Sequence, residues 1–133
     1  MYLLDSNACI RVLNRTSESL VERLRRHDPS EIRISSVVKA ELLYGARRSG
    51  RVAENLSLLQ RFFQPFLSLP FDDRCAEHYG VVRTQLERDG RPIGPNDLMI
   101  AATAMAHDLV LVTNNTGEFL RVAGLAVEDW QMP

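Results

Sequence analysis

Three acidic side chains of this sequence stand where a carboxylate is unusual. Asp5 directly follows the short apolar run at 2–4, which is typical of a buried strand that ends at a polar edge. Glu41 lies three or four residues from apolar or small neighbours, namely Val37, Val38, Tyr44 and Gly45. Asp97 falls in the first turn of a very apolar predicted helix that Pro95 opens. A carboxylate in such surroundings is costly to bury unless something cationic compensates it.

Each of these acids also has a simpler interpretation. Asp5 is a suitable N-cap for the helix that follows it, and Asp97 is suited to oppose the dipole of its own helix. Glu41 is placed to form a buried ion pair with Arg47 or Arg48. Taken one at a time these interpretations stay open, but they explain the combined pattern less well than a shared site does.

A fourth polar group follows the apolar stretch 109–112. As ordinary turn chemistry this run is unremarkable. As part of a shared site it adds three oxygen-bearing side chains, Thr113, Asn115 and Glu118. Further polar side chains next to the acids are candidates for supporting roles, namely Ser6, Asn7 and Asn96.

The types of side chain point to Mg²⁺ or Mn²⁺. Several carboxylates at one edge repel one another and raise one another's pKa, and a bound divalent cation removes that problem. The available ligands are hard oxygens, and no histidine stands at ligand spacing in the sequence, since His27, His78 and His107 are scattered. This set favours Mg²⁺ or Mn²⁺ over zinc or copper. A carboxylate-held Mg²⁺ usually serves phosphate chemistry.

Alternating strands and helices are expected to position these residues. The hydrophobic pattern predicts short strands at 2–4, 32–34, 66–69, 109–112 and 125–127. It predicts helices at 7–14, 17–26, 37–48, 51–64, 73–89 and 95–107. Such alternation is typical of a mostly parallel sheet covered by helices on both faces, which binds ligands outside the carboxyl ends of its strands.

Length and composition exclude several classes of protein. A chain of 133 residues that is 45% hydrophobic and 25% charged suits one globular domain over 1–133. No apolar run approaches the roughly 18–20 residues needed to cross a bilayer, and the N-terminus lacks the basic region of a signal peptide. We therefore expect a cytoplasmic protein without a membrane partner, whose Cys9 and Cys75 are reduced thiols. The net charge of −1 argues against a constitutively basic nucleic-acid binder.

Four segments together resemble the motifs of PIN-domain ribonucleases, and most closely those of the VapC toxins of bacterial type II toxin–antitoxin modules. The segments are Leu3-Leu4-Asp5-Ser6-Asn7, Ala40-Glu41-Leu42-Leu43-Tyr44-Gly45, Ile93-Gly94-Pro95-Asn96-Asp97-Leu98 and Val112-Thr113-Asn114-Asn115 with Glu118-Phe119. Any one of them is a weak signal. Their order and spacing, which extend over almost the whole chain, make the resemblance specific.

The resemblance implies a PIN-like α/β/α sandwich and a Mg²⁺- or Mn²⁺-dependent endoribonuclease that leaves 5′-phosphate and 3′-hydroxyl ends. It also implies a toxin that forms a homodimer and is neutralised by a cognate antitoxin in a hetero-oligomer. Asp5, Glu41 and Asp97 align with the metal-binding acids of the family. The fourth acid of the family commonly stands where this chain has Asn115, which makes the nearby Glu118 the candidate for that role.

The same interpretation gives the basic and apolar surfaces possible uses. Fifteen of the 16 basic residues are Arg, and five of them are candidates to follow an RNA backbone: Arg11, Arg15, Arg47, Arg48 and Arg51. A solvated helix face is the simpler interpretation for each of them. The apolar side chains between the helices at 37–48 and 51–64 suit an antitoxin groove, a homodimer face or core packing.

Other classes of protein fit less well. A haloacid-dehalogenase-like phosphatase requires Asp-x-Asp, but this chain reads Asp5-Ser6-Asn7. A response-regulator receiver requires a lysine on a late strand, and Lys39 is the only lysine. A PIN-like binding module with a degenerate site stays open because of Asn115, and metal-dependent RNA cleavage would distinguish it from an enzyme.

Overall fold

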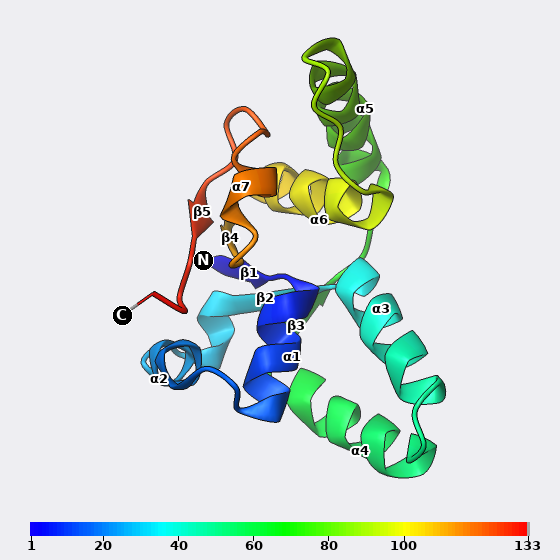
Figure 1. The fold of residues 1–133 in the computed structure, drawn as a ribbon, viewed down its shortest axis with the longest axis vertical. Coiled ribbons are helices and arrows are strands. Elements are labelled where there is room, and N and C mark those ends of the chain that lie inside the picture. The colour runs from blue at the N-terminus through cyan, green and yellow to red at the C-terminus, as the bar shows by residue number, and fades with distance from the viewer. Residues whose placement is uncertain (133) are drawn as a thin grey trace.

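A five-stranded parallel sheet forms the centre of the molecule (Figure 1). The computed structural model describes residues 1–132. The strands are β1 (Tyr2–Leu4), β2 (Ile32–Ser35), β3 (Leu67–Leu69), β4 (Val110–Val112) and β5 (Val127–Glu128). Their order across the sheet is β3-β2-β1-β4-β5, and each neighbouring pair is parallel.

Seven α-helices and one short 3₁₀ helix connect these strands. The α-helices are α1 (Ser6–Asn14), α2 (Glu18–Arg25), α3 (Ser36–Arg47), α4 (Val52–Phe63), α5 (Asp73–Arg88), α6 (Pro95–Ala106) and α7 (Thr116–Phe119). The 3₁₀ helix η1 (Pro29–Glu31) leads into β2. In Figure 1, α1 and α2 lie on one side of the sheet, and α5, α6 and α7 lie on the other. This arrangement confirms the expected α/β/α sandwich.

The order of the strands creates a switch point at the centre of the sheet. From β1 the chain adds β2 and then β3 on one side, and it returns to place β4 and β5 on the other side of β1. In a parallel sheet, a crevice opens at such a point outside the carboxyl ends of the two strands. Asp5 directly follows β1 and Thr113 directly follows β4, so both residues border this crevice.

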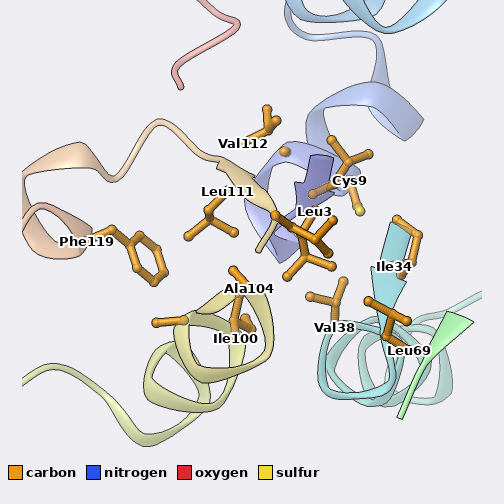
Figure 2. Close-up of a cluster of buried hydrophobic side chains, with 14 of the residues drawn as sticks. Leu3, Cys9, Ile34, Val38, Leu69, Ile100, Ala104, Leu111, Val112 and Phe119 are labelled. Carbon is orange, nitrogen blue, oxygen red and sulfur yellow. The ribbon is translucent and has the colours of Figure 1, made fainter. Parts of the chain in front are cut away.

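The core is continuous through the sheet. Leu3 and Leu111 are neighbours in the parallel register of β1 and β4, and both are fully buried. Figure 2 shows Ile100 and Ala104 of α6 on one side of these strands. The small side chains of α6, which are Ala101, Ala102, Ala104 and Ala106, let this helix approach the sheet closely and explain why so apolar a helix is buried.

The predicted elements agree with the structure except near the C-terminus. Ser17 caps α2 as expected, and α5 ends just before Gly90, whose φ of 67° suits glycine. The strand predicted at 125–127 is wrong in position, because the last strand is Val127–Glu128. The segment interpreted as a turn after β4 contains α7, which is four residues long and too short to give a periodic pattern.

Both cysteines are free and buried, as the sequence predicts for reduced thiols. Within residues 1–132, no helix is long and apolar enough to cross a membrane.

Leu111→Ala should destabilise the protein by about 2–5 kcal/mol, because it removes a fully buried side chain from the centre of the sheet and leaves a cavity. Chemical denaturation followed by circular dichroism measures this change. Val81→Ala is the matched control, since Val81 is 70% exposed on α5 and its truncation should change the free energy of unfolding by less than about 0.5 kcal/mol. Equal midpoints for the two variants would contradict the proposed core.

Candidate active site

Asp5 both caps a helix and faces the crevice. Its Oδ1 accepts a hydrogen bond of 2.8 Å from the Ala8 amide, so it is the N-cap of α1. The side chain is buried, and burial raises its pKa, with the charge of Glu41 acting in the same direction. Hydrogen bonds from the Thr113 side chain and the Ala8 amide oppose this shift without cancelling it. Asp5 is therefore both the N-cap of α1 and part of the shared acidic site.

Glu41 is held by a hydroxyl and not by an arginine. Ser6 Oγ, at the start of α1, donates a hydrogen bond of 2.7 Å to Glu41 Oε1 on α3. Among the described residues, Glu41 has no ion-pair partner, so the alternative of a buried pair with Arg47 or Arg48 is wrong. Arg48 instead lies over the exposed ring of Tyr44, at 5.3 Å from its centroid.

Asp97 and Glu118 form a closely coupled pair of carboxyl groups. Burial raises the pKa of Asp97 to about 7, together with the charge of Glu118 and a hydrogen bond between the two side chains. Burial disfavours ionisation of Glu118 too, but hydrogen bonds from Asn115 Nδ2 (2.6 Å) and the Gly94 amide (3.3 Å) outweigh it and lower its pKa. Near neutral pH, Glu118 is therefore ionised while Asp97 retains much of its proton.

All four acids face the same space. The charges of Glu118, Asp5 and Glu41 each raise the pKa of Asp97, and these residues come from α7, the end of β1, and α3. No three of the four bring their carboxylate oxygens within 4.8 Å of one another in the described part of the chain. Mg²⁺ retains several water ligands and is usually bound directly by one or two carboxylates. The side chains that border the crevice offer carboxylate, hydroxyl and amide oxygens, which are the ligands of hard divalent cations, so the residues present fit such an ion.

The supporting polar residues fall into two groups. Thr113 is buried, hydrogen-bonds to Asp5 and accepts a bond of 2.9 Å from the Asn115 amide. Asn115 in turn orients Glu118, so Thr113 and Asn115 link Asp5, at the end of β1, to Glu118 on α7. Asn7 and Asn96 are exposed, and neither side chain makes a hydrogen bond within residues 1–132. Asn96 nevertheless lines a hollow of about 450 Å³ with Glu41 and Tyr44.

One contributor to the site has no side chain. The amide of Gly94 donates to Glu118 from the residue before Pro95, and Gly94 is also the N-cap of α6. The segment Ile93-Gly94-Pro95 belongs to the third PIN-like motif of the sequence, but a sequence does not show which backbone amide will face a carboxylate.

The five candidate arginines are not gathered at one place. Arg11 lies near the acids, where its charge opposes the burial that raises the pKa of Asp5. Arg15 ends α1 in a left-handed conformation. Arg47 and Arg48 lie at the far end of α3, and Arg51 pairs with Glu54 at 3.3 Å. Of the five, only Arg11 acts on the acidic crevice directly.

Comparison with known proteins identifies the family. The PIN domain family matches residues 2–125. The chain is 42% identical over 129 residues to a protein of Shigella flexneri named tRNA(fMet)-specific endonuclease VapC, covering 97% of each chain. It is 40% identical over 131 residues to ribonuclease VapC2 of Rickettsia felis, covering 98% of each.

Solved structures of VapBC complexes resemble the chain in fold and sequence. The chain superimposes with a TM-score of 0.91 and 39% identity on a crystal structure of VapBC2 from Rickettsia felis bound to a DNA fragment from their promoter, covering 97% of this chain and 98% of that one. A structure of DNA-bound VapBC from Salmonella typhimurium gives the same TM-score and identity.

A parallel α/β/α sandwich with carboxylates at its switch point defines a class of nuclease hydrolases with an acidic centre. Within that class, the chain belongs to the PIN-domain family and to its VapC ribonuclease members.

Metal-free protein should lose stability as the pH rises, because Asp97 must then ionise beside three other carboxyl groups. Its pKa rises from 3.8 to about 7 on folding, so its contribution favours the folded state at low pH and is lost between about pH 4 and about pH 7. In EDTA, Asp97→Asn should melt a few degrees above the wild type at about pH 8 and close to it at about pH 4. Thermal melts across this range measure the difference.

Asp73→Asn is the control for this prediction, because Asp73 is exposed in the first turn of α5. Its melting temperature should follow that of the wild type at every pH. Parallel curves for Asp97→Asn and the wild type would show that the four acids do not interact as described.

Proposed function

We propose that this chain is a divalent-metal-dependent endoribonuclease, that it acts as the toxin of a type II toxin–antitoxin module in the cytoplasm, and that 1–133 form one PIN domain. The observation that carries the proposal is the convergence of Asp5, Glu41, Asp97 and Glu118 outside the carboxyl ends of β1 and β4. A metal-dependent nuclease needs several carboxylates in one crevice to hold its ion, whereas a binding module has no need for four carboxylates that repel one another.

The residues suit a particular division of roles. Asp5 and Asp97 are proposed to hold Mg²⁺ or Mn²⁺ directly, and Glu41 to hold it directly or through water. Glu118 takes the place of the fourth acid, because Asn115 holds its carboxylate beside Asp97. A divalent cation bound there supplies Lewis acidity toward the phosphodiester and lowers the pKa of an attacking water.

The chain's own residues keep these oxygens in position. Ser6 orients Glu41, Thr113 orients Asp5, and Asn115 with the Gly94 amide orients Glu118. The acidic proton of Asp97 is the one that ion binding must displace, because its pKa of about 7 leaves it partly protonated at neutral pH. Metal affinity is therefore expected to increase as the pH rises toward about 8.

The RNA is proposed to enter beside Glu41. Tyr44 is 62% exposed on α3, one helical turn after Glu41, and offers a ring on which a base can stack. Arg11, Arg15, Arg47, Arg48 and Arg51 are the proposed contacts to the phosphates. Because the relative from Shigella flexneri is named a tRNA(fMet)-specific endonuclease, initiator tRNA is the first substrate to test.

A cognate antitoxin is the proposed partner of an apolar groove. A pocket of about 350 Å³ lies between α1, α3 and α4, and it includes the partly exposed side chains of Ile10 and Leu58. Glu41 lies at the edge of the same pocket, so a segment bound there reaches the acidic centre. The related structures are VapBC complexes, which supports a hetero-oligomer with an antitoxin. A homodimer of the toxin is part of the same proposal.

Asp5→Asn should reduce cleavage of tRNA at least about a hundredfold, because it removes a proposed metal ligand. Asparagine is also a good N-cap, so the melting temperature should stay within a few degrees of the wild type. Asp5→Ala should lose the activity and about 1 kcal/mol of stability, since alanine cannot accept the Ala8 amide. Gel analysis of initiator tRNA with Mg²⁺, Mn²⁺ or EDTA gives the activity. Full activity in a folded Asp5→Asn protein would exclude this assignment.

Leu58→Glu should weaken neutralisation by the cognate antitoxin, because it places a charge in the apolar groove. It should leave RNA cleavage unchanged, because Leu58 is neither a proposed metal ligand nor a proposed RNA contact. The measurement is inhibition of tRNA cleavage by increasing antitoxin. Val81→Glu, on exposed α5 surface, is the control and should be inhibited as the wild type is. Equal inhibition of Leu58→Glu would place the antitoxin elsewhere.

A further inference from the structure

A second group of metal-ligating side chains lies away from the acidic crevice. Asp72, Cys75 and His107 bring one ligand atom each to within 4.8 Å of one another. Asp72 and Cys75 are at the start of α5, and His107 is at the end of α6. Along α6, His107 is ten residues from Asp97, or about 15 Å at the rise of an α-helix, so the two groups are separate.

The backbone of all three residues is held by the ends of two helices. Asp72 is the N-cap of α5 and accepts a hydrogen bond of 3.1 Å from the Cys75 amide, which places both side chains on the first turn. After His107, Asp108 adopts a left-handed φ of 52°, and the Leu109 amide bonds to the Ala104 carbonyl at 2.9 Å. The α6 helix therefore stops at a defined residue, and the imidazole has a fixed point of attachment.

One ring nitrogen of His107 lacks a partner in the described part of the chain. His107 Nε2 is buried and has no hydrogen-bond partner among the described residues. A buried polar nitrogen without a partner costs free energy, and such atoms are rare in folded proteins. A histidine binds a metal ion in its neutral form, through the lone pair of a ring nitrogen. Capping α5 uses one hydrogen bond to a carboxylate that has about four acceptor positions, so Asp72 keeps room for an ion.

We propose that Asp72, Cys75 and His107 form a zinc-binding site that joins the start of α5 to the end of α6. A thiol, an imidazole and a carboxylate are the ligands that Zn²⁺ accepts, and a soft thiolate disfavours Mg²⁺. Tetrahedral zinc, with bonds of about 2.0–2.3 Å, holds its ligand atoms about 3.4–3.8 Å apart. Side-chain rotations that shorten the distances between the three ligand atoms by about 1 Å are enough to reach this geometry. Asp72 is exposed, so the ion enters from solvent and water takes the fourth position.

The role of such an ion is structural. The α5 and α6 helices make the most extensive contact between any two elements of the fold, and α6 carries Asp97 at its other end. An ion at this junction fixes the end of α6 and so stabilises the helix that delivers Asp97. This zinc site is separate from the acidic crevice, and its ion binds whether or not the chain cleaves RNA.

Cobalt spectroscopy of a chain that lacks Asp5 and Asp97 tests this inference. In Asp5→Asn/Asp97→Asn protein, Co²⁺ should produce a thiolate-to-cobalt charge-transfer band in the near ultraviolet, and one equivalent of Zn²⁺ should abolish it. Zn²⁺ should also raise the melting temperature of the same protein. Because both acids proposed to hold the nuclease ion directly, Asp5 and Asp97, are replaced, failure here and failure of the proposed function are distinguishable.

Variants of this double mutant identify the ligands. Cys75→Ser should remove the band, and His107→Ala should weaken Zn²⁺ binding about tenfold or more. Cys9→Ser and His78→Ala are the matched controls, because they change the other cysteine and another α5-region histidine, and both should retain the band. Absence of the band in a double mutant that circular dichroism shows to be folded, or persistence of the band in Cys75→Ser, would overturn the inference.

Discussion

Mutual repulsion of four carboxyl groups in one crevice is the constraint on which the structure depends. Without compensation, four anions this close would destabilise the fold. Hydrogen bonds compensate part of this repulsion. Each acid other than Asp97 has a dedicated donor: the Ala8 amide and Thr113 for Asp5, Ser6 for Glu41, and Asn115 with Gly94 for Glu118. Within residues 1–132, Asp97 has no such donor, and it instead keeps a proton, with a pKa of about 7. A divalent cation completes the compensation, which links the folding of this edge to the chemistry proposed for it.

The topology explains why residues far apart in sequence share this crevice. The β1 strand is central, so Asp5 has neighbours on both sides of the switch point. The α6 helix is rich in alanine and packs closely on the sheet, which brings its first turn and Asp97 to the same edge. The apolar groove between α1, α3 and α4 opens at Glu41, so one residue borders both the acidic centre and the surface proposed for the antitoxin.

The sequence predicts the sandwich and the meeting of the acids because both follow from strand ends sharing one edge of a parallel sheet. Local patterns predict the N-cap Ser17 and Pro95 at the first position of α6, since helix starts are determined by a few consecutive residues. Contacts between distant segments lie beyond such patterns. The sequence offered Arg47 or Arg48 as partners of Glu41, but the structure gives it Ser6. The three histidines are scattered along the sequence, yet folding brings His107 close to Asp72 and Cys75.

The most direct test of the central claim is a crystal structure of the protein soaked with Mn²⁺, with the ion located by its anomalous scattering. The account predicts an anomalous peak in the crevice between β1 and β4, bonded to Asp5 and Asp97 and within reach of Glu41 and Glu118. A crevice without a peak at saturating Mn²⁺, with these side chains unchanged, would contradict the claim that the four acids form a metal centre.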